Sequence, residues 1–274
     1  RGDQHNEFGF MFTPRTLLKY DVAPRTIVRA NIGTGWRTVN LFSENIGLLV
    51  SSRDIIFVEA LEPEKAINYG INLTQKFETK DVNLSGYISV DYYHTGFQNQ
   101  IFPDYDSDPT IAIIKNFTGT SVSNGFQAEV YLKMWERVEV KTGYTYLDVY
   151  REVAEENELL PFNPKHKILT TFSFAPLSNR YHFDVNMHWY GEQRLPDTKS
   201  NPAEFQRPDF SDPYTVVSAQ LTYTFGAFEV YGGCENIFDF RQLQPIISWQ
   251  DPFSPYFDTS SVWGPTRGRE IYLG

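Results

Sequence analysis

The sequence has little of several features that mark other classes of protein. It has a single cysteine, Cys234, so the chain cannot form an internal disulfide. Its longest apolar runs, such as residues 46–50, are far below the roughly 18 residues of a membrane-spanning helix. Basic residues are too few to balance the acidic ones, and the net charge of −10 argues against a nucleic-acid partner. If the chain crosses a membrane, it must do so with β-strands.

The segment 181–190 alternates strictly between two kinds of side chain. Successive side chains of a strand point to opposite faces, so this segment has one apolar face and one polar face. The same alternation returns along the chain, and aromatic residues make up 16% of it, which suits rings at membrane interfaces. This pattern is typical of an outer-membrane barrel with lipid outside and water or ligand inside. The apolar set is Tyr181, Phe183, Val185, Met187 and Trp189, and the polar set is His182, Asp184, Asn186, His188 and Tyr190.

The alternation predicts an all-β fold with eleven strands. Short turns and long loops alternate between the strands, and bacterial barrels have short periplasmic turns and long external loops. The strands are expected near 7–21, 26–36, 66–78, 82–97, 117–135, 138–150, 165–175, 181–193, 213–225, 227–239 and 266–274. The short turns are expected at 23–25, 78–81, 136–137, 177–180 and 226–227, and the long loops at 37–65, 98–116, 151–164, 194–212 and 240–265.

The number of strands carries a further expectation. Single-chain bacterial barrels have an even number of strands, with both chain ends in the periplasm. An odd number here therefore predicts that residues 1–274 are the C-terminal half of a transmembrane antiparallel barrel of about 22 strands, the size class of plugged transporters.

Five segments of the chain resemble one known family. Their order and spacing resemble those of TonB-dependent outer-membrane receptors, and the last two resemble receptors from the Bacteroidetes. They are RANIGTGWR at 29–37, EKAINYG at 64–70, ENIFD at 235–239, FDTSSVWGP at 257–265 and GREIYLG at 268–274.

The resemblance implies the rest of the machinery. It implies a barrel closed by an N-terminal plug, and active uptake of a scarce nutrient such as a siderophore or other chelated metal, a cobalamin or an oligosaccharide. The implied partners are outer-membrane lipid, the receptor's own plug, the TonB complex and the nutrient ligand, with a surface lipoprotein as a further candidate. The plug and the TonB box do not lie in these 274 residues. No cofactor is implied.

Ligand-binding residues are expected on the external rim and in the upper lumen. Aromatic rings there provide contact area, and a few charged groups orient a ligand. The alternative is that the rings belong to the interfacial girdle and the charged residues only fold the loops, or that Arg37, Arg267 and Arg269 pack against the plug. The candidates are Trp36, Arg37, Tyr93, His94, Tyr190, Gln193, Arg194, Trp249, Asp251, Asp258, Trp263 and Arg267.

Other functions have weaker support in the sequence. His182, Asp184 and His188 share a strand face, but same-face neighbours are about 6.6–7 Å apart, too far for one ion to bind all three at about 2.0–2.2 Å. We therefore interpret them as polar lumen lining rather than a metal site. No nucleophile–base constellation indicates an enzyme. The alternatives that remain are a porin or adhesin without energy coupling, and a soluble β-sandwich binding module.

Overall fold

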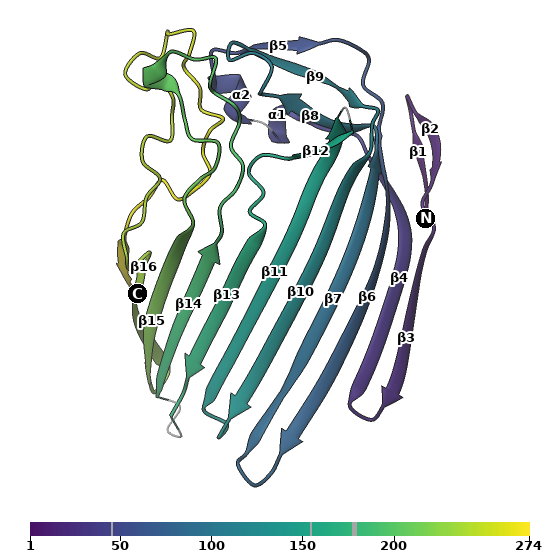
Figure 1. The fold of residues 1–274 in the computed structure, drawn as a ribbon. Helices are drawn as coiled ribbons and strands as arrows, with labels where there is room; N and C mark the ends of the chain where they lie inside the picture. The colour runs from purple at the N-terminus through teal and green to yellow at the C-terminus, as the bar shows by residue number, and fades with distance from the viewer. Residues whose placement is uncertain (45, 154, 177–179) are drawn as a thin grey trace.

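The computed structural model describes residues 1–44, 46–153, 155–176 and 180–274. Within these ranges, eleven strands follow one another in chain order across one antiparallel sheet, and a twelfth, β12 (Glu156–Leu159), pairs with the end of β11 (Figure 1). The eleven are β3 (Arg15–Ala23), β4 (Thr26–Arg37), β6 (Glu64–Thr79), β7 (Leu84–Gln98), β10 (Ser121–Met134), β11 (Val138–Val153), β13 (His166–Phe174), β14 (Tyr181–Tyr190), β15 (Tyr214–Phe225), β16 (Phe228–Glu235) and β17 (Glu270–Leu273).

These eleven strands confirm the predicted fold class, but some boundaries differ. The expected strand over 7–21 is wrong in its first half. There β1 (Gly2–His5) and β2 (Gly9–Phe12) form a separate hairpin, and β3 begins after Pro14, which has no N–H to donate to a sheet. The expected strand over 227–239 is too long, because Asn236 has a φ of 48°, in the left-handed region, which does not continue a strand.

The connections divide the sheet into two ends. Short turns lie at one end and long loops at the other, as Figure 1 shows. The turns after β3, β6, β10 and β15 are tight. Glu136, in the turn after β10, and Gly226, in the turn after β15, adopt positive φ values of 58° and 63°. The turn expected at 177–180 falls largely on residues 177–179, which lie outside the described residues.

The long loops contain regular structure that sequence analysis leaves as loop. They hold α1 (Leu41–Glu44), α2 (Ile46–Val50), β5 (Asp54–Phe57), β8 (Gln100–Asp104), β9 (Ile111–Phe117) and the 3₁₀ helix η1 (Ala203–Phe205). Strand β9 pairs in parallel with β5 and antiparallel with β8, so a small sheet joins the first two long loops. Neither α1 nor α2, the α-helices of the described residues, could cross a membrane.

An apolar core lies in this loop layer rather than in the wall. Ile101 and Ile114 are buried there, and Val39, Ile55 and Leu61 pack against them. The wall is one sheet thick, and its apolar side chains remain exposed on one face. Such a wall needs an apolar surrounding to cover that face.

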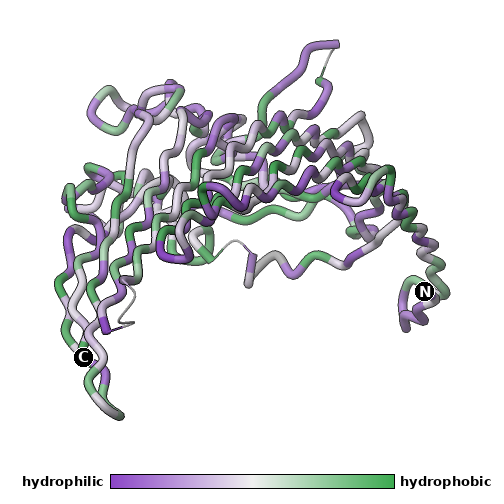
Figure 2. Tube along the Cα trace, turned by 90° about the horizontal axis from the view of Figure 1, so that it is seen from below, coloured by the Kyte–Doolittle hydropathy of each residue, from purple (hydrophilic) through white to green (hydrophobic). Residues whose placement is uncertain are grey.

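The two faces of the wall differ in polarity. On β14, Val185 lies beside Phe172 and Ala219, whereas the next residue, Asn186, lies beside Thr171 and Ser218. Figure 2 shows the sheet curved into an open trough, with hydrophobic and hydrophilic residues alternating along its strands.

Polar side chains on the inward face bond to one another across strands. Arg29 Nη1 donates to Asn72 Oδ1 at 2.9 Å, and Asn72 Nδ2 donates to Asp91 Oδ1 at 2.7 Å. On the next strands Tyr87 donates its hydroxyl to Glu129 Oε1 at 2.5 Å. The arrangement is that of a barrel wall with its polar face toward the lumen and its apolar face toward lipid.

A matched pair of substitutions tests this assignment of faces. We expect Val185→Arg to destabilise the folded receptor by about 2–4 kcal/mol, because it places a cation against the lipid interior. Asn186→Arg, one residue along on the inward face, is the control and should have a much smaller effect. Denaturant unfolding of the full-length receptor in lipid vesicles measures both. Equal effects would contradict the assignment.

Candidate functional site

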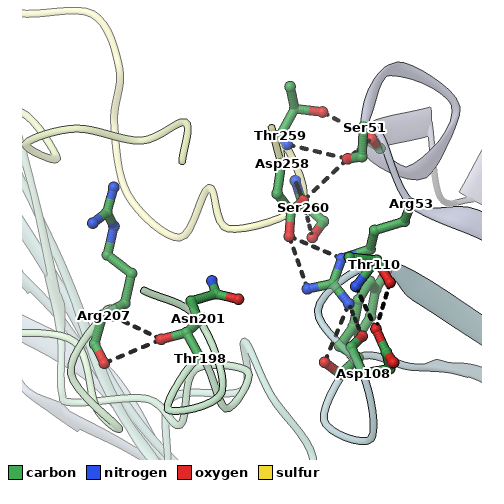
Figure 3. Close-up of polar contacts among 12 residues, drawn as sticks. Ser51, Arg53, Asp108, Thr110, Thr198, Asn201, Arg207, Asp258, Thr259 and Ser260 are labelled. Atoms are coloured by element: carbon green, nitrogen blue, oxygen red, sulfur yellow. Dashed lines mark hydrogen bonds and ion pairs between the residues drawn. The ribbon is translucent and has the colours of Figure 1, made fainter. Parts of the chain in front are cut away.

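The external rim is organised around an ion pair between Arg53 and Asp258. Arg53 Nε and Nη2 lie 3.0 and 2.9 Å from Asp258 Oδ2, and the two side chains are only 2% and 4% exposed. The residues are 205 positions apart. This pair, which we call the rim latch, therefore joins the first long loop of the chain to the last (Figure 3).

Both members of the rim latch have further hydrogen bonds. Arg53 Nη1 donates to the carbonyl oxygens of Asp108 at 3.0 Å and Tyr105 at 3.3 Å. The second carboxylate oxygen of Asp258 accepts from Ser51 Oγ at 3.0 Å and from the backbone N–H and hydroxyl of Ser260 at 2.7 and 2.6 Å. A buried pair is tolerated when its remaining donors and acceptors are satisfied in this way. The latch thus holds three long loops in one arrangement.

A second group of charges joins the middle loops. Arg194 Nη2 lies 2.6 Å from Asp106 Oδ2 and 3.6 Å from Glu158 Oε1. Arg151 holds Glu158 with two parallel bonds of 2.9 Å, and its guanidinium lies over the ring of Phe102. Arg194 Nη1 is buried without a hydrogen-bond partner among the described residues. This group links loops 98–116, 151–164 and 194–212.

Aromatic rings form a third group at the upper ends of β14 and β15. Tyr190 stacks on Tyr214 with centroids 4.9 Å apart, and Tyr214 stacks on Phe240 at 4.8 Å. Trp263 lies 5.7 Å from Tyr214 and 6.3 Å from Phe240. Tyr190 and Tyr214 belong to the inward face, so these rings line the upper lumen.

Two buried glutamines hold Trp263 in place. Gln193 Nε2 donates to the Trp263 carbonyl at 3.0 Å. Gln242 Oε1 accepts from the Trp263 and Gly264 backbone N–H groups at 2.7 and 3.0 Å. Because glutamine can donate and accept at once, each one joins two segments that share no secondary structure.

A cavity of about 270 Å³ opens beside this aromatic group. Its walls include Arg207, Phe240, Arg241, Gln242 and Trp263. Burial lowers the pKa of Arg207, and its guanidinium has no ion-pair partner among the described residues. In Figure 3 the guanidinium points away from Thr198 and Asn201. A partly desolvated cation beside aromatic rings has the chemistry to bind an anionic group.

The predicted site residues separate into several groups. Tyr190, Gln193 and Trp263 come together in the aromatic group, and Arg194 lies in the charged group next to it. Asp258 is committed to the rim latch. For these five residues, contact with a ligand stays a prediction.

Two predicted residues lie on the unexpected face. Trp36 and His94 belong to the outward row of β4 and β7, so neither side chain lines the upper lumen, and ligand contact at the external rim stays a prediction for both. Trp36 donates Nε1 to Asp3 at 3.3 Å. His94 stacks on Tyr69 at 4.7 Å and lies 2.8 Å from Asn124 Oδ1. The physical reason is the strand period of two, which separates each of them from its inward neighbour, Arg37 or Tyr93.

The remaining candidates bind neighbouring residues or remain exposed. Arg37 Nε lies 2.5 Å from Glu64 Oε2, and Tyr93 donates to Asp91 at 3.1 Å. Asp251 accepts from the Phe253 backbone N–H at 3.1 Å, and Arg267 lies 3.6 Å from Glu270. Trp249 is 56% exposed.

Sequence reasoning missed Arg53, Asp106, Arg207 and Gln242. Nothing in the local sequence marks them, because their partners are up to 205 residues away. Among the described residues, no three His, Cys, Asp or Glu side chains are close enough together to hold a metal ion.

Wall, rim and cavity together define one wall of an outer-membrane β-barrel with an organised external mouth. The sequence pattern of the family described as TonB dependent receptor-like, beta-barrel, matches residues 1–237. The chain belongs to this family, and it is an outer-membrane protein.

Comparison with known proteins agrees with this family. The chain is 21% identical over 295 residues to the ferric enterobactin receptor PirA of Pseudomonas aeruginosa. The match covers the full length of this chain but only 37% of that relative. The relatives named here come from Pseudomonas, Acinetobacter and Escherichia, so the resemblance to Bacteroidetes receptors stays a prediction.

Solved structures show the same fold. The ferric enterobactin receptor PfeA, solved in complex with BCV-L6, matches with a TM-score of 0.69 at 15% identity, over 99% of this chain and 41% of PfeA. The siderophore receptor PirA from Acinetobacter baumannii matches with a TM-score of 0.69 at 13% identity, over 99% and 41%. The ferric-catecholate import receptor Fiu from E. coli K12 matches with a TM-score of 0.65 at 15% identity, over 97% and 34%.

Removal of one member of the rim latch should loosen the rim. We expect Asp258→Ala to cost about 3–5 kcal/mol, because it leaves the Arg53 guanidinium buried and unpaired. Asp209→Ala is the matched control. It breaks the exposed pair with Lys199, whose side chains are 55% and 67% exposed, and should cost less than about 1 kcal/mol. Limited proteolysis and thermal unfolding of the full-length receptor would measure both. Similar losses in the two variants would refute the role of the latch.

The rim should also weaken at high pH. Burial raises the pKa of Tyr105 to about 12, and the nearby Asp258 carboxylate adds to the shift. Between about pH 10 and pH 12 the folded chain keeps this proton while the unfolded chain loses it, so stability falls as pH rises, by up to about 2–3 kcal/mol. Tyr105→Phe should lose less stability between about pH 8 and pH 11 than the parent. The free energy of unfolding of both proteins is measured at the two pH values. An equal loss of stability in Tyr105→Phe and in the parent would contradict this.

Proposed function

We propose that residues 1–274 form the C-terminal part of the barrel of a TonB-dependent receptor that takes up a ferric siderophore. In the described sheet, β3 and β17 each have one unpaired edge, which suits pairing with further strands of a larger barrel. The coverage of about two fifths of the related structures agrees with this. The role is transport, with no catalytic step.

The cavity beside Trp263 carries the proposal for the ligand. The unpaired Arg207 guanidinium favours an anionic ligand, and the Phe240 and Trp263 rings favour flat apolar groups. An anionic chelate with planar rings has both properties. A neutral oligosaccharide would leave this partly buried cation unpaired, so the cavity supports a siderophore above an oligosaccharide. Names of relatives, such as ferric enterobactin receptor PirA, agree with this choice.

The inward polar face supports the proposed partners. Arg29, Asn72, Asp91 and Glu129 present charge and hydrogen-bonding groups toward the lumen. A plug domain that fills the lumen would meet these groups, and the TonB complex would act through that plug. The alternative is a porin without energy coupling. Its uptake would be independent of TonB.

Substitution of the cationic residue Arg207 tests the ligand proposal. We expect Arg207→Ala in the full-length receptor to weaken ferric-siderophore binding by about 10–100-fold, the effect of losing one charge-assisted hydrogen bond. Lys199→Ala is the control, because it removes an exposed cation from the same loop, and should bind as the parent does. Binding is measured with ferric enterobactin, and iron-limited growth with and without TonB tests uptake. Equal binding by both variants would remove Arg207 from the site, and growth that ignores TonB would overturn the transport proposal.

A further inference from the structure

A second cavity lies on the outward side of the wall, away from the proposed siderophore site. It has a volume of about 580 Å³ and lies between the β1–β2 hairpin and the upper ends of β4, β6 and β7. The wall contributes outward residues of two successive register rows, with Trp36 beside Lys65 in one and Ile67 beside Gly96 in the next. We call this cavity the outer groove.

The hairpin is attached to the wall at Trp36. Trp36 Nε1 donates to Asp3 Oδ2 at 3.3 Å, and the His5 ring meets the indole edge-on with centroids 5.9 Å apart. Met11 is opposite Asp3 in the hairpin, and residues 10–13 form the other side of the groove. The outer groove thus has two walls, which the Asp3–Trp36 hydrogen bond and the His5–Trp36 ring contact join.

The outer groove continues into the lipid-facing surface. Directly below it on the outward face of β6 lie Ile67, Tyr69, Ile71 and Leu73, all of which are exposed in the chain by 45–53%. These residues belong to the apolar face that the membrane covers. An acyl chain that lies on this face can therefore enter the groove without leaving an apolar surface.

The floor of the outer groove is open because of Gly96. A Cβ added there would lie 3.8 Å from Ile67 Cγ2 and 3.9 Å from His94 Nε2, which is ordinary contact distance, so there is space for a Cβ at this position. The wall is therefore hollow at this point for lack of a side chain.

A cation marks the upper end of the outer groove. Lys65 is exposed on the outward row of β6, at the end that leads into the long loop, and it forms no ion pair with the described residues. A lysine at this position keeps its methylenes on the apolar surface and its ammonium at the level of lipid head groups. An anionic head group is the complementary partner at that level.

We propose that the outer groove binds one acyl chain of an anionic lipid, with the phosphate of its head group on Lys65. The lipid comes from the outer leaflet that surrounds the barrel, because the groove opens to the lipid face and not to the lumen. This site is separate from the proposed siderophore cavity, and it does not depend on that proposal.

Native mass spectrometry of the full-length receptor in detergent tests the proposal. The probe is bisphosphorylated lipid A, compared with the same lipid after removal of its phosphates and with inorganic phosphate alone. The parent should retain one lipid A, and should bind the dephosphorylated lipid about tenfold more weakly, the effect of one lost charge-assisted contact. Inorganic phosphate alone should not compete, because it lacks the acyl chain.

Three variants separate the parts of the outer groove. Lys65→Gln should lower lipid A binding by about tenfold, and Gly96→Phe should abolish it by filling the groove. Lys76→Gln removes an inward lysine of the same strand, and should bind as the parent does. Siderophore binding by every variant verifies that the receptor is folded, or heat-modifiable migration does so if the siderophore proposal fails. Retention of lipid A by both Lys65→Gln and Gly96→Phe, or equal binding of the dephosphorylated lipid, would overturn the proposal.

Discussion

The arrangement of the external rim depends on the buried ion pair between Arg53 and Asp258. Two charges placed away from water are tolerated only in close contact and with their other donors and acceptors bonded. Here the carbonyls of the 98–116 loop and the hydroxyls of Ser51 and Ser260 supply those bonds. Such a pair adds little net stability compared with apolar residues of the same size, but it accepts only one geometry. It therefore fixes where loops that are distant in sequence meet.

The wall follows a different rule from the rim. Each wall strand bonds to its sequence neighbour, so its register is set by short turns and by the need to keep one face apolar. A shift of one residue would send Asn186 to the lipid and Val185 to the lumen. The wall can thus be specified by local pattern alone, while the rim needs contacts between residues far apart.

This difference explains how far the sequence could predict the molecule. The alternation in 181–190 predicts β14 and its faces, and comparable segments predict all eleven wall strands. Local chemistry also explains where the strand boundaries in the wall differ from the prediction. One example is the break at Pro14, after which β3 begins at Arg15. In the rim, Trp263 could be suspected as an aromatic residue in the last loop, but its supports, Gln193 and Gln242, come from different loops. A single sequence contains no pattern for such a contact. The outward position of Trp36 and His94 follows from the strand register, which the upper end of a strand does not reveal by itself.

The proposed siderophore cavity has two walls of unequal rigidity. Trp263 is five residues beyond Asp258 and is also held by two buried glutamines, so its wall is fixed by the rim latch. Arg207 lies in the part of the 194–212 loop beyond the Arg194–Asp106 pair, where the Lys199–Asp209 pair is exposed to solvent and contributes little. Its backbone N–H is held only locally, by Thr198 Oγ1 at 2.7 Å. If a ligand draws the cavity closed, the movement should therefore come from the wall that carries the unpaired cation, while the aromatic wall stays in place.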